Sequence, residues 1–360
     1  WFAAGSHTVN RGKDMLLKLK NSSLIAALVV VGLTLSACGG GGGGSSDGGA
    51  AGGMTGAGSG GGGSTDGGTT DPVTPGDDAL PALVSGVLQG TLTLVAGNPD
   101  GYGVVGGDLA DARFQQPNLL ISDGHGGYFL SDIGAYVIRR ITASGKVYTY
   151  AGVPYSKGYR NGAASQALFN NPRGLALDSA GNLYVADSGN IAIRKITPDG
   201  EVSTVAGGPS NVGYTDGPVA TADFLYPEGV GVDAAGNIFV ADTMNDCLRK
   251  VTPAGVVSTF SGACTMALNA ATPIDGTNIT ARFKDLGQIL MKADGSMYVT
   301  DSGAVRHVAT NGSVTTIAGM LGTHDFADGV GSAARFKRPQ GMALSGTTLV
   351  AADPGNMRIR

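Results

Sequence analysis

The sequence predicts an all-β fold, and two observations carry this prediction. From residue 86 to residue 360, short runs of alternating apolar and polar residues recur, and amphipathic patterns of helix length are absent. Five segments of similar sequence begin at about residues 114, 169, 224, 283 and 336, so their first phenylalanines lie 55, 55, 59 and 53 residues apart. Repeats of this length, each with four antiparallel strands, are typical of the blades of a β-propeller.

The unit that begins at Phe169 reads FNNPRGLALDSAGNLYVADSGNIAIRKITPDGEVSTVAG and shows the pattern most clearly. We expect its strands at Gly174–Leu177, Leu183–Ala186, Ile191–Ile196 and Val202–Ala206. The segments between them are rich in Asp, Asn, Gly, Ser and Pro, which favour tight turns. A stacked parallel β-helix is the alternative architecture, but its coils are usually much shorter than this repeat.

A second phrase recurs between the units. It reads GYRNGAASQALF from Gly158, GYTDGPVATADF from Gly213 and DFADGVGSAARF from Asp325. We expect it to form a compact connection between blades. The phenylalanines that follow it should fill the spaces between neighbouring blades; they are Phe169, Phe224, Phe283 and Phe336.

The segment Pro172–Asn190 fits the pattern P-x-G-[apolar]-A-[apolar]-D-x-x-G-N-[apolar]-Y-V-A-D-x-x-N, which returns in the other units. In this it resembles the NHL-repeat propellers, and the resemblance covers residues 90–360. The His and Leu that give that family its name are not retained, because Asn190 is followed by Ile-Ala and Asn245 by Asp-Cys. This departure weakens the transfer of a particular function more than it weakens the fold prediction.

Closure of the ring has two alternatives, because the last unit stops at Arg360, inside its third strand. The phrase GTLTLVAG at Gly90–Gly97 resembles a fourth strand, so residues 91–96 can complete the last blade and give a closed ring of five. NHL propellers are more often six-bladed. We therefore expect six blades in the complete protein and a chain here that lacks about one of them.

Residues 15–37 have the pattern of a secretory signal peptide. Met15 is followed by lysines, then by the apolar run Leu24–Leu35, which is too short to span a bilayer comfortably. Residues 1–14 are then expected to be an upstream, non-native extension. An ordinary transmembrane anchor is the alternative interpretation.

The ending Leu-Ser-Ala-Cys resembles the lipobox of bacterial lipoproteins. This resemblance implies cleavage before Cys38, lipidation of that cysteine and a lipid-anchored location at the cell envelope. Gly39 stands where an Asp would favour the inner membrane, so the outer membrane is expected if the source is Gram-negative.

Residues 38–85 consist largely of Gly, Ser, Thr, Asp and Pro, which predicts a disordered tether before the propeller of residues 86–360. The net charge is −4 and 14% of residues are charged, so no basic surplus points to nucleic acid as a partner. We expect a monomer that meets the membrane only through its lipid. Cys247 and Cys264 form either a disulfide or two buried thiols, and their spacing does not decide between these.

One acidic and one basic position recur in all five units. The aspartates are Asp132, Asp187, Asp242, Asp301 and Asp353, and the arginines are Arg139, Arg194, Arg249, Arg306 and Arg360. An active site needs different residues that converge on one point, so a pair copied into every blade indicates a structural role. We expect each Asp to accept backbone N–H groups of the turn that follows it, and each Arg to pair with an Asp.

The residues that do not repeat are the better candidates for function. At the position that leads into each first strand stand Asn118, Arg173, Glu228, Gly287 and Gln340. We predict that Asn118, Arg173, Glu228 and Gln340 bind a protein or glycan at one mouth of the central channel, without a cofactor or metal.

The alternative function is enzymatic. Propellers of the lactonase type hold a divalent metal over the channel, and related lyases use histidine-rich sites. Here the folded part contains only His125, His307 and His324, at unrelated positions of the repeat and without metal-ligand spacing. Motifs for a nucleophile elbow or a phosphate loop are absent from residues 86–360. We therefore expect a non-enzymatic binding or scaffolding module.

Overall fold

The structure is a computed structural model that describes residues 94–98, 101–265 and 272–360. The predicted signal peptide, Cys38 and the tether lie outside these residues. Within the described part of the chain, no helix has both the length and the apolar character needed to cross a membrane.

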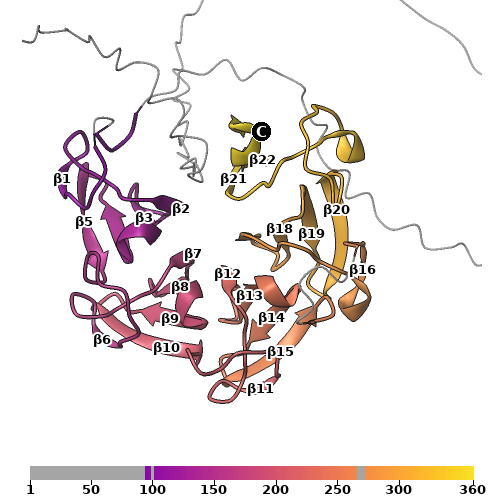
Figure 1. Ribbon diagram of the computed structural model, residues 1–360, viewed down its shortest axis with the longest axis horizontal. Coiled ribbons are helices and arrows are strands. Elements are labelled where there is room, and N and C mark those ends of the chain that lie inside the picture. The colour runs from indigo at the N-terminus through magenta and orange to yellow at the C-terminus, as the bar shows by residue number, and fades with distance from the viewer. Residues whose placement is uncertain (1–93, 99–100, 266–271) are drawn as a thin grey trace, which may run out of the picture. The chain divides into compact units, whose positions relative to one another are not determined.

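Five antiparallel sheets follow one another along the chain and stand side by side around a common centre, which confirms the predicted propeller (Figure 1). The main strands of the first two blades are β2 (Pro117–Ser122), β3 (Tyr128–Asp132), β4 (Val137–Ile141), β5 (Lys146–Ala151), β7 (Pro172–Leu177), β8 (Leu183–Asp187), β9 (Ala192–Ile196) and β10 (Glu201–Gly207). Those of the other blades are β12 (Pro227–Val232), β13 (Ile238–Asp242), β14 (Cys247–Val251), β15 (Val256–Ser261), β17 (Ile289–Met291), β18 (Met297–Asp301), β19 (Ala304–Val308), β20 (Ser313–Gly319), β21 (Met342–Ser345), β22 (Thr348–Asp353) and β23 (Arg358–Ile359). The first strands β2, β7, β12 and β17 lie innermost and contact one another in sequence.

The repeated connection adds a strand that the sequence did not predict. Four blades carry a two-residue outermost strand, antiparallel to the fourth strand of the same blade. These strands are β1 (Gly107–Asp108), β6 (Gly162–Ala163), β11 (Gly217–Pro218) and β16 (Gly276–Thr277). Each connection therefore belongs to the blade that follows it, because it closes that blade's outer edge before the chain enters the innermost strand.

In the second blade the strands lie close to their predicted positions. All four predicted strands are present, with ends that differ by at most two residues. The third strand begins at Ala192 rather than Ile191, because Ile191 has a φ of 55° at the end of a short 3₁₀ helix. The 3₁₀ helices are η2 (Ile133–Ala135), η3 (Ser188–Asn190), η4 (Thr243–Asn245), η5 (Asn278–Thr280), η6 (Gly331–Ala333) and η7 (Pro354–Asn356).

The core lies between blades, where the predicted phenylalanines are buried. Phe224 packs with Ile193 of the second blade and with Val240 of the third. Phe169, Phe283 and Phe336 fill the equivalent spaces, which confirms the prediction for all four. The phenylalanine needs a glycine opposite it: a Cβ on Gly207 would lie 3.0 Å from the Phe224 ring and 2.3 Å from the Ile191 carbonyl oxygen.

The first described residues lie against the first blade. The Gly97 N–H donates to the Leu109 carbonyl at 2.8 Å, and the Asn98 N–H donates to the Ala112 carbonyl at 2.9 Å. Among the described residues the last sheet has three strands, β21, β22 and β23. Residues 91–93 lie outside that part of the chain, so the pairing of 91–96 with the last unit stays a prediction, as does a sixth blade.

Candidate functional site

The repeated Asp and Arg form an ion pair inside the blade. In the second blade, Arg194 Nη1 donates to Asp187 Oδ2 at 2.7 Å, and both side chains are fully buried. Arg194 also donates to the carbonyls of Leu168 and Arg160, and its guanidinium lies 5.2 Å from the Phe169 ring centre. The arginine thus ties the third strand to the segment that precedes the first strand.

The same arrangement recurs with differences in geometry. The Arg–Asp distance is 3.0 Å in the third blade, 2.6 Å in the fourth, 3.7 Å in the fifth and 3.9 Å in the first. The fourth blade keeps its pair although its turn is two residues shorter, because Asp301 and Arg306 still face each other across the hairpin. Each pair lies within a single blade.

The expected backbone partners of these aspartates were wrong. The N–H groups that donate to the carboxylates come from upstream residues that lead into the first strand, not from the turn that follows. Asn170 donates to Asp187, and Leu225 donates to Asp242, both at 2.7 Å. The following turn contributes only a side chain, such as the Asn190 amide at 2.8 Å from Asp187. The reason is that the second strand ends beside the start of the first.

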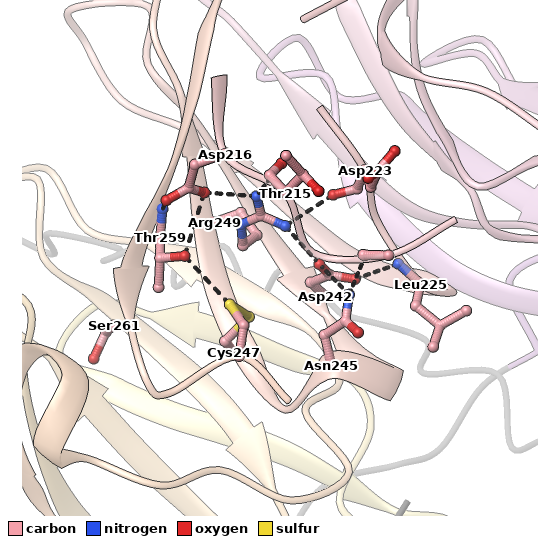
Figure 2. The surroundings of a disulfide bond; sticks show 12 residues. Thr215, Asp216, Asp223, Leu225, Asp242, Asn245, Cys247, Arg249, Thr259 and Ser261 are labelled. Carbon is pink, nitrogen blue, oxygen red and sulfur yellow. Dashed lines mark hydrogen bonds and ion pairs between the residues drawn. A yellow bond between two sulfur atoms is a disulfide. The ribbon is translucent and has the colours of Figure 1, made fainter. Parts of the chain in front are cut away.

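The third blade contains a disulfide between Cys247 and Cys264. It joins the start of β14 to the chain just after β15, close to the ion pair of Arg249 and Asp242 (Figure 2). Asp216 accepts a second donor of Arg249 at 2.7 Å and also contacts Thr259. The sequence had left disulfide and free thiols as equal alternatives.

The residues that do not repeat converge on one pocket. Asn118, Arg173, Glu228, Gly287 and Gln340 all line it, one from each of the five blades. Leu119, Gly174, Gln288 and Gly341 complete the lining. The pocket lies where the first strands begin, and we call this end of the propeller the entry face. Its volume is about 40 Å³, which corresponds to about three water molecules.

Arg173 and Glu228 form an ion pair within this lining. Arg173 Nη1 lies 3.2 Å from Glu228 Oε1, and about a fifth of each side chain is exposed. Tyr226 holds the arginine, because its hydroxyl accepts from Arg173 Nη2 at 3.2 Å and its ring centre lies 5.3 Å from the guanidinium. Burial raises the pKa of Glu228, and Asp285 adds to the rise, while Arg173 and Arg338 oppose it.

Close packing of the inner strands brings this pair together. A Cβ on Gly174 would lie 2.4 Å from the Glu228 carbonyl oxygen, so only glycine allows β7 to approach β12 so closely. In the next interface, a Cβ on Gly229 would lie 2.2 Å from the Gly287 carbonyl oxygen. The glycines that follow Arg173 and Glu228 therefore let the inner strands approach closely at this end of the propeller.

A second ring of residues was missed by sequence reasoning. Four residues, each two positions before one of the pocket residues at the start of a first strand, have positive φ values. They are Asn171 (53°), Tyr226 (55°), Asp285 (57°) and Arg338 (69°). This left-handed conformation is uncommon for residues other than glycine, and such strain tends to gather at functional sites. The sequence could have indicated these four residues by their position alone. Each lies shortly before a first strand, and the side chains at this position differ in chemistry from blade to blade.

The pocket does not have the donor set of a divalent-metal site. Glu228 is the one carboxylate among its lining residues, and it faces a guanidinium that repels cations. His125 lies between β2 and β3, His307 within β19, and His324 after β20, none of them in the lining. In the described residues as a whole, no three His, Cys, Asp or Glu side chains gather as metal ligands.

Comparison with known proteins places this geometry among repeat propellers. Residues 169–196 match the NHL repeat, and they contain the first three strands of the second blade. NHL repeat-containing protein 2 of Bos taurus is 29% identical over 186 residues, which are 48% of this chain and 25% of that protein. Teneurin-3 of Mus musculus is 24% identical over 226 residues, or 55% of this chain and 8% of its own length.

A plant relative is similar over a comparable stretch. SUPPRESSOR OF QUENCHING 1, a chloroplastic protein of Arabidopsis thaliana, is 26% identical over 174 residues, which are 46% of this chain and 16% of that protein. The chain therefore spans a quarter or less of the length of these curated relatives.

Two solved structures are similar to this chain over most of its length. An auxiliary nutrient binding protein from Bacteroides thetaiotaomicron has a TM-score of 0.47 and 16% identity over 74% of each chain. Virginiamycin B lyase from Staphylococcus aureus has a TM-score of 0.43 and 16% identity over 68% of this chain and 65% of the other. The chain is a β-propeller of five blades in which residues 169–196 match the NHL repeat.

Proposed function

We propose that this propeller is a non-enzymatic binding module whose ligand sits on the entry face, over the pocket of Arg173 and Glu228. One observation carries the proposal. Five blades share a repeated frame, yet each contributes a residue of different chemistry to the same pocket. Binding proteins often have a rigid scaffold that carries varied side chains at the binding site. The repeated blades and the varied pocket residues fit this arrangement.

The pocket supports binding better than catalysis. Hydrolysis of glycosides by the common mechanism uses two carboxylates that flank the scissile bond, whereas this lining has one. The alternative of a metal-dependent lactonase or lyase needs several anionic or imidazole ligands, which these lining residues do not supply. A ligand larger than the cavity of about 40 Å³ would rest across its mouth and against the second ring.

We infer further that the propeller is displayed at the bacterial cell envelope, on a lipid attached to Cys38 and a tether of residues 38–85. The support is the sequence pattern of residues 15–38. Fractionation of cells that express the full chain tests this inference. We expect the protein in the membrane fraction with a labelled acyl chain, and a Cys38→Ala variant in the soluble fraction without the label. An unlabelled wild-type protein would contradict the anchor.

The binding site is tested with a triple variant, Arg173→Ala, Glu228→Ala and Gln340→Ala. The probes are a panel of neutral disaccharides, charged disaccharides and short peptides, and the readout is the shift of the unfolding temperature of the full chain. At least one probe should raise the unfolding temperature of the wild type but not of the triple variant. Lys292→Met is the matched control, because it removes a partly exposed ion pair of 2.9 Å with Asp294 beyond the far end of β17 from the pocket. A triple variant that responds like the wild type refutes the site.

A further inference from the structure

The charges in the pocket cancel each other. Arg173 and Glu228 are its charged lining residues, and their side chains already form an ion pair of 3.2 Å. A ligand with a net charge must therefore compete with one member of this pair and leave the other partly desolvated, which costs free energy. An uncharged ligand can bind both groups through hydrogen bonds without separating them.

The remaining polar groups of the lining are carboxamides. Asn118, Gln288 and Gln340 come from the first, fourth and fifth blades. A carboxamide offers both donors and an acceptor in one plane, as does the Arg173–Glu228 pair taken together. Hydroxyl groups on adjacent carbons also offer donors and acceptors at short spacing, so they complement such planar groups.

One carboxamide is already fixed in place. Gln288 Oε1 accepts from the backbone N–H of Met342, which orients its amide nitrogen and links the fourth blade to the fifth. Arg173 is likewise fixed by Tyr226, and Asn171 donates to the same tyrosine hydroxyl at 3.5 Å. Groups that are held before binding lose little conformational entropy when a ligand arrives.

We propose that the pocket recognises a neutral saccharide, whose hydroxyl-bearing edge enters between Asn118, Gln340 and the Arg173–Glu228 pair. This inference rests on the proposed binding function and names the ligand class of the same site. The small cavity admits an edge of a sugar ring rather than a whole ring, and the rest of the sugar lies on the rim beside Tyr226. With a single carboxylate in the lining, the saccharide is held and not cleaved.

Calorimetric titration of the full chain tests the proposal with probes matched in size. The neutral probes are maltose, cellobiose, lactose, sucrose and trehalose; the charged ones are digalacturonic acid and the glucosamine dimer. At least one neutral disaccharide should bind at least tenfold more tightly than both charged dimers. Asn118→Ala and Gln340→Ala should each weaken that binding at least fivefold, while Lys292→Met leaves it unchanged.

Gln340→Glu provides a second variant that keeps the size of the side chain. It should weaken binding as much as Gln340→Ala, because it adds a charge and removes two donors. The proposal is overturned if either charged dimer binds as tightly as the best neutral one, if no neutral disaccharide binds, or if the Asn118 and Gln340 variants keep full affinity. If only a peptide binds, and the triple variant loses it, the binding function stands while the saccharide assignment fails. If no probe of any kind binds, both fail.

Discussion

Two arginines of the second blade form ion pairs with carboxylates, and the two pairs differ in burial, spacing and repetition. Arg194 and Asp187 are fully buried, 2.7 Å apart, and have counterparts in every other blade. Arg173 and Glu228 are about one-fifth exposed, 3.2 Å apart, and join the second blade to the third. The comparison teaches that the kind of ion pair does not reveal its role, whereas burial and repetition do.

The largest effect should follow from loss of the buried pair. Arg194→Met leaves the buried Asp187 carboxyl without its main partner, and it removes the bonds to Leu168 and Arg160. We expect the free energy of unfolding to fall by about 3–5 kcal/mol, the usual range for breaking a buried pair. Chemical denaturation of the full chain measures this loss.

The equivalent variant of the first blade, Arg139→Met, is the comparison for this effect. Its arginine lies 3.9 Å from Asp132, and Gly106 stands where, in the second blade, Asn161 accepts a hydrogen bond from Arg194. Asp132 accepts backbone N–H groups of both Gln115 and Gln116, so it keeps partners when the arginine is lost. We expect a smaller loss than for Arg194→Met. Equal losses would show that the ion pair itself contributes little.

A second test uses a carboxyl that follows the repeated aspartate of the third blade. Burial raises the pKa of Asp246 to about 6, and the charge of Asp285 contributes to the rise. The folded protein thus holds this proton more tightly than the unfolded chain does. Its stabilising effect is present below a pH of about 4 and is lost as the pH rises through about 6.

Asp246→Asn removes this titration and suits the φ of 54° at the site, which Asn tolerates. We expect the variant to gain stability relative to the wild type between a pH of about 4 and about 7, with a constant difference at higher pH. Denaturation at a series of pH values measures this, with Asp199→Asn in an exposed turn as control. A difference that does not change with pH is incompatible with the burial of Asp246.

The smallest effect on stability should come from the pocket. Arg173→Met removes a partly exposed pair, and such pairs contribute about 1 kcal/mol or less. We expect a loss of stability within that range, together with a clear loss of ligand binding. A loss as large as that of Arg194→Met would mean that Arg173 is part of the blade frame and not of a recognition surface.

Much of the fold could be predicted because the same local pattern occurs five times. Alternation at Leu183–Asp187 defines a strand, and its recurrence identifies a blade. The outer strands such as Gly162–Ala163 could not be predicted, since two residues carry no periodicity and their pairing depends on the fourth strand nearby in space. The same applies to the backbone partners of Asp187, which come from 17 residues upstream.

The pocket was predicted in part for a similar reason. Equivalent positions of a propeller lie around one axis, so Asn118, Arg173, Glu228 and Gln340 had to converge once the repeat was aligned. Gln288 escaped notice because three of the equivalent residues in other blades are glycines, and Tyr226 because a positive φ leaves no mark in the sequence of a tyrosine. Their contribution depends on contacts between blades, which one unit alone does not contain.

The packing of each phenylalanine against a glycine of the preceding blade has a consequence for how such a gene can change. A segment from Phe169 to Asp223 carries at its start the ring that fits the previous blade, and within it Gly207, which receives the ring of the next. Recombination between repeats therefore exchanges, adds or removes whole units in register, and every new junction inherits a matched pair. Each exchanged unit brings its own residue to the pocket, so duplication alters the pocket lining while it leaves the joints intact.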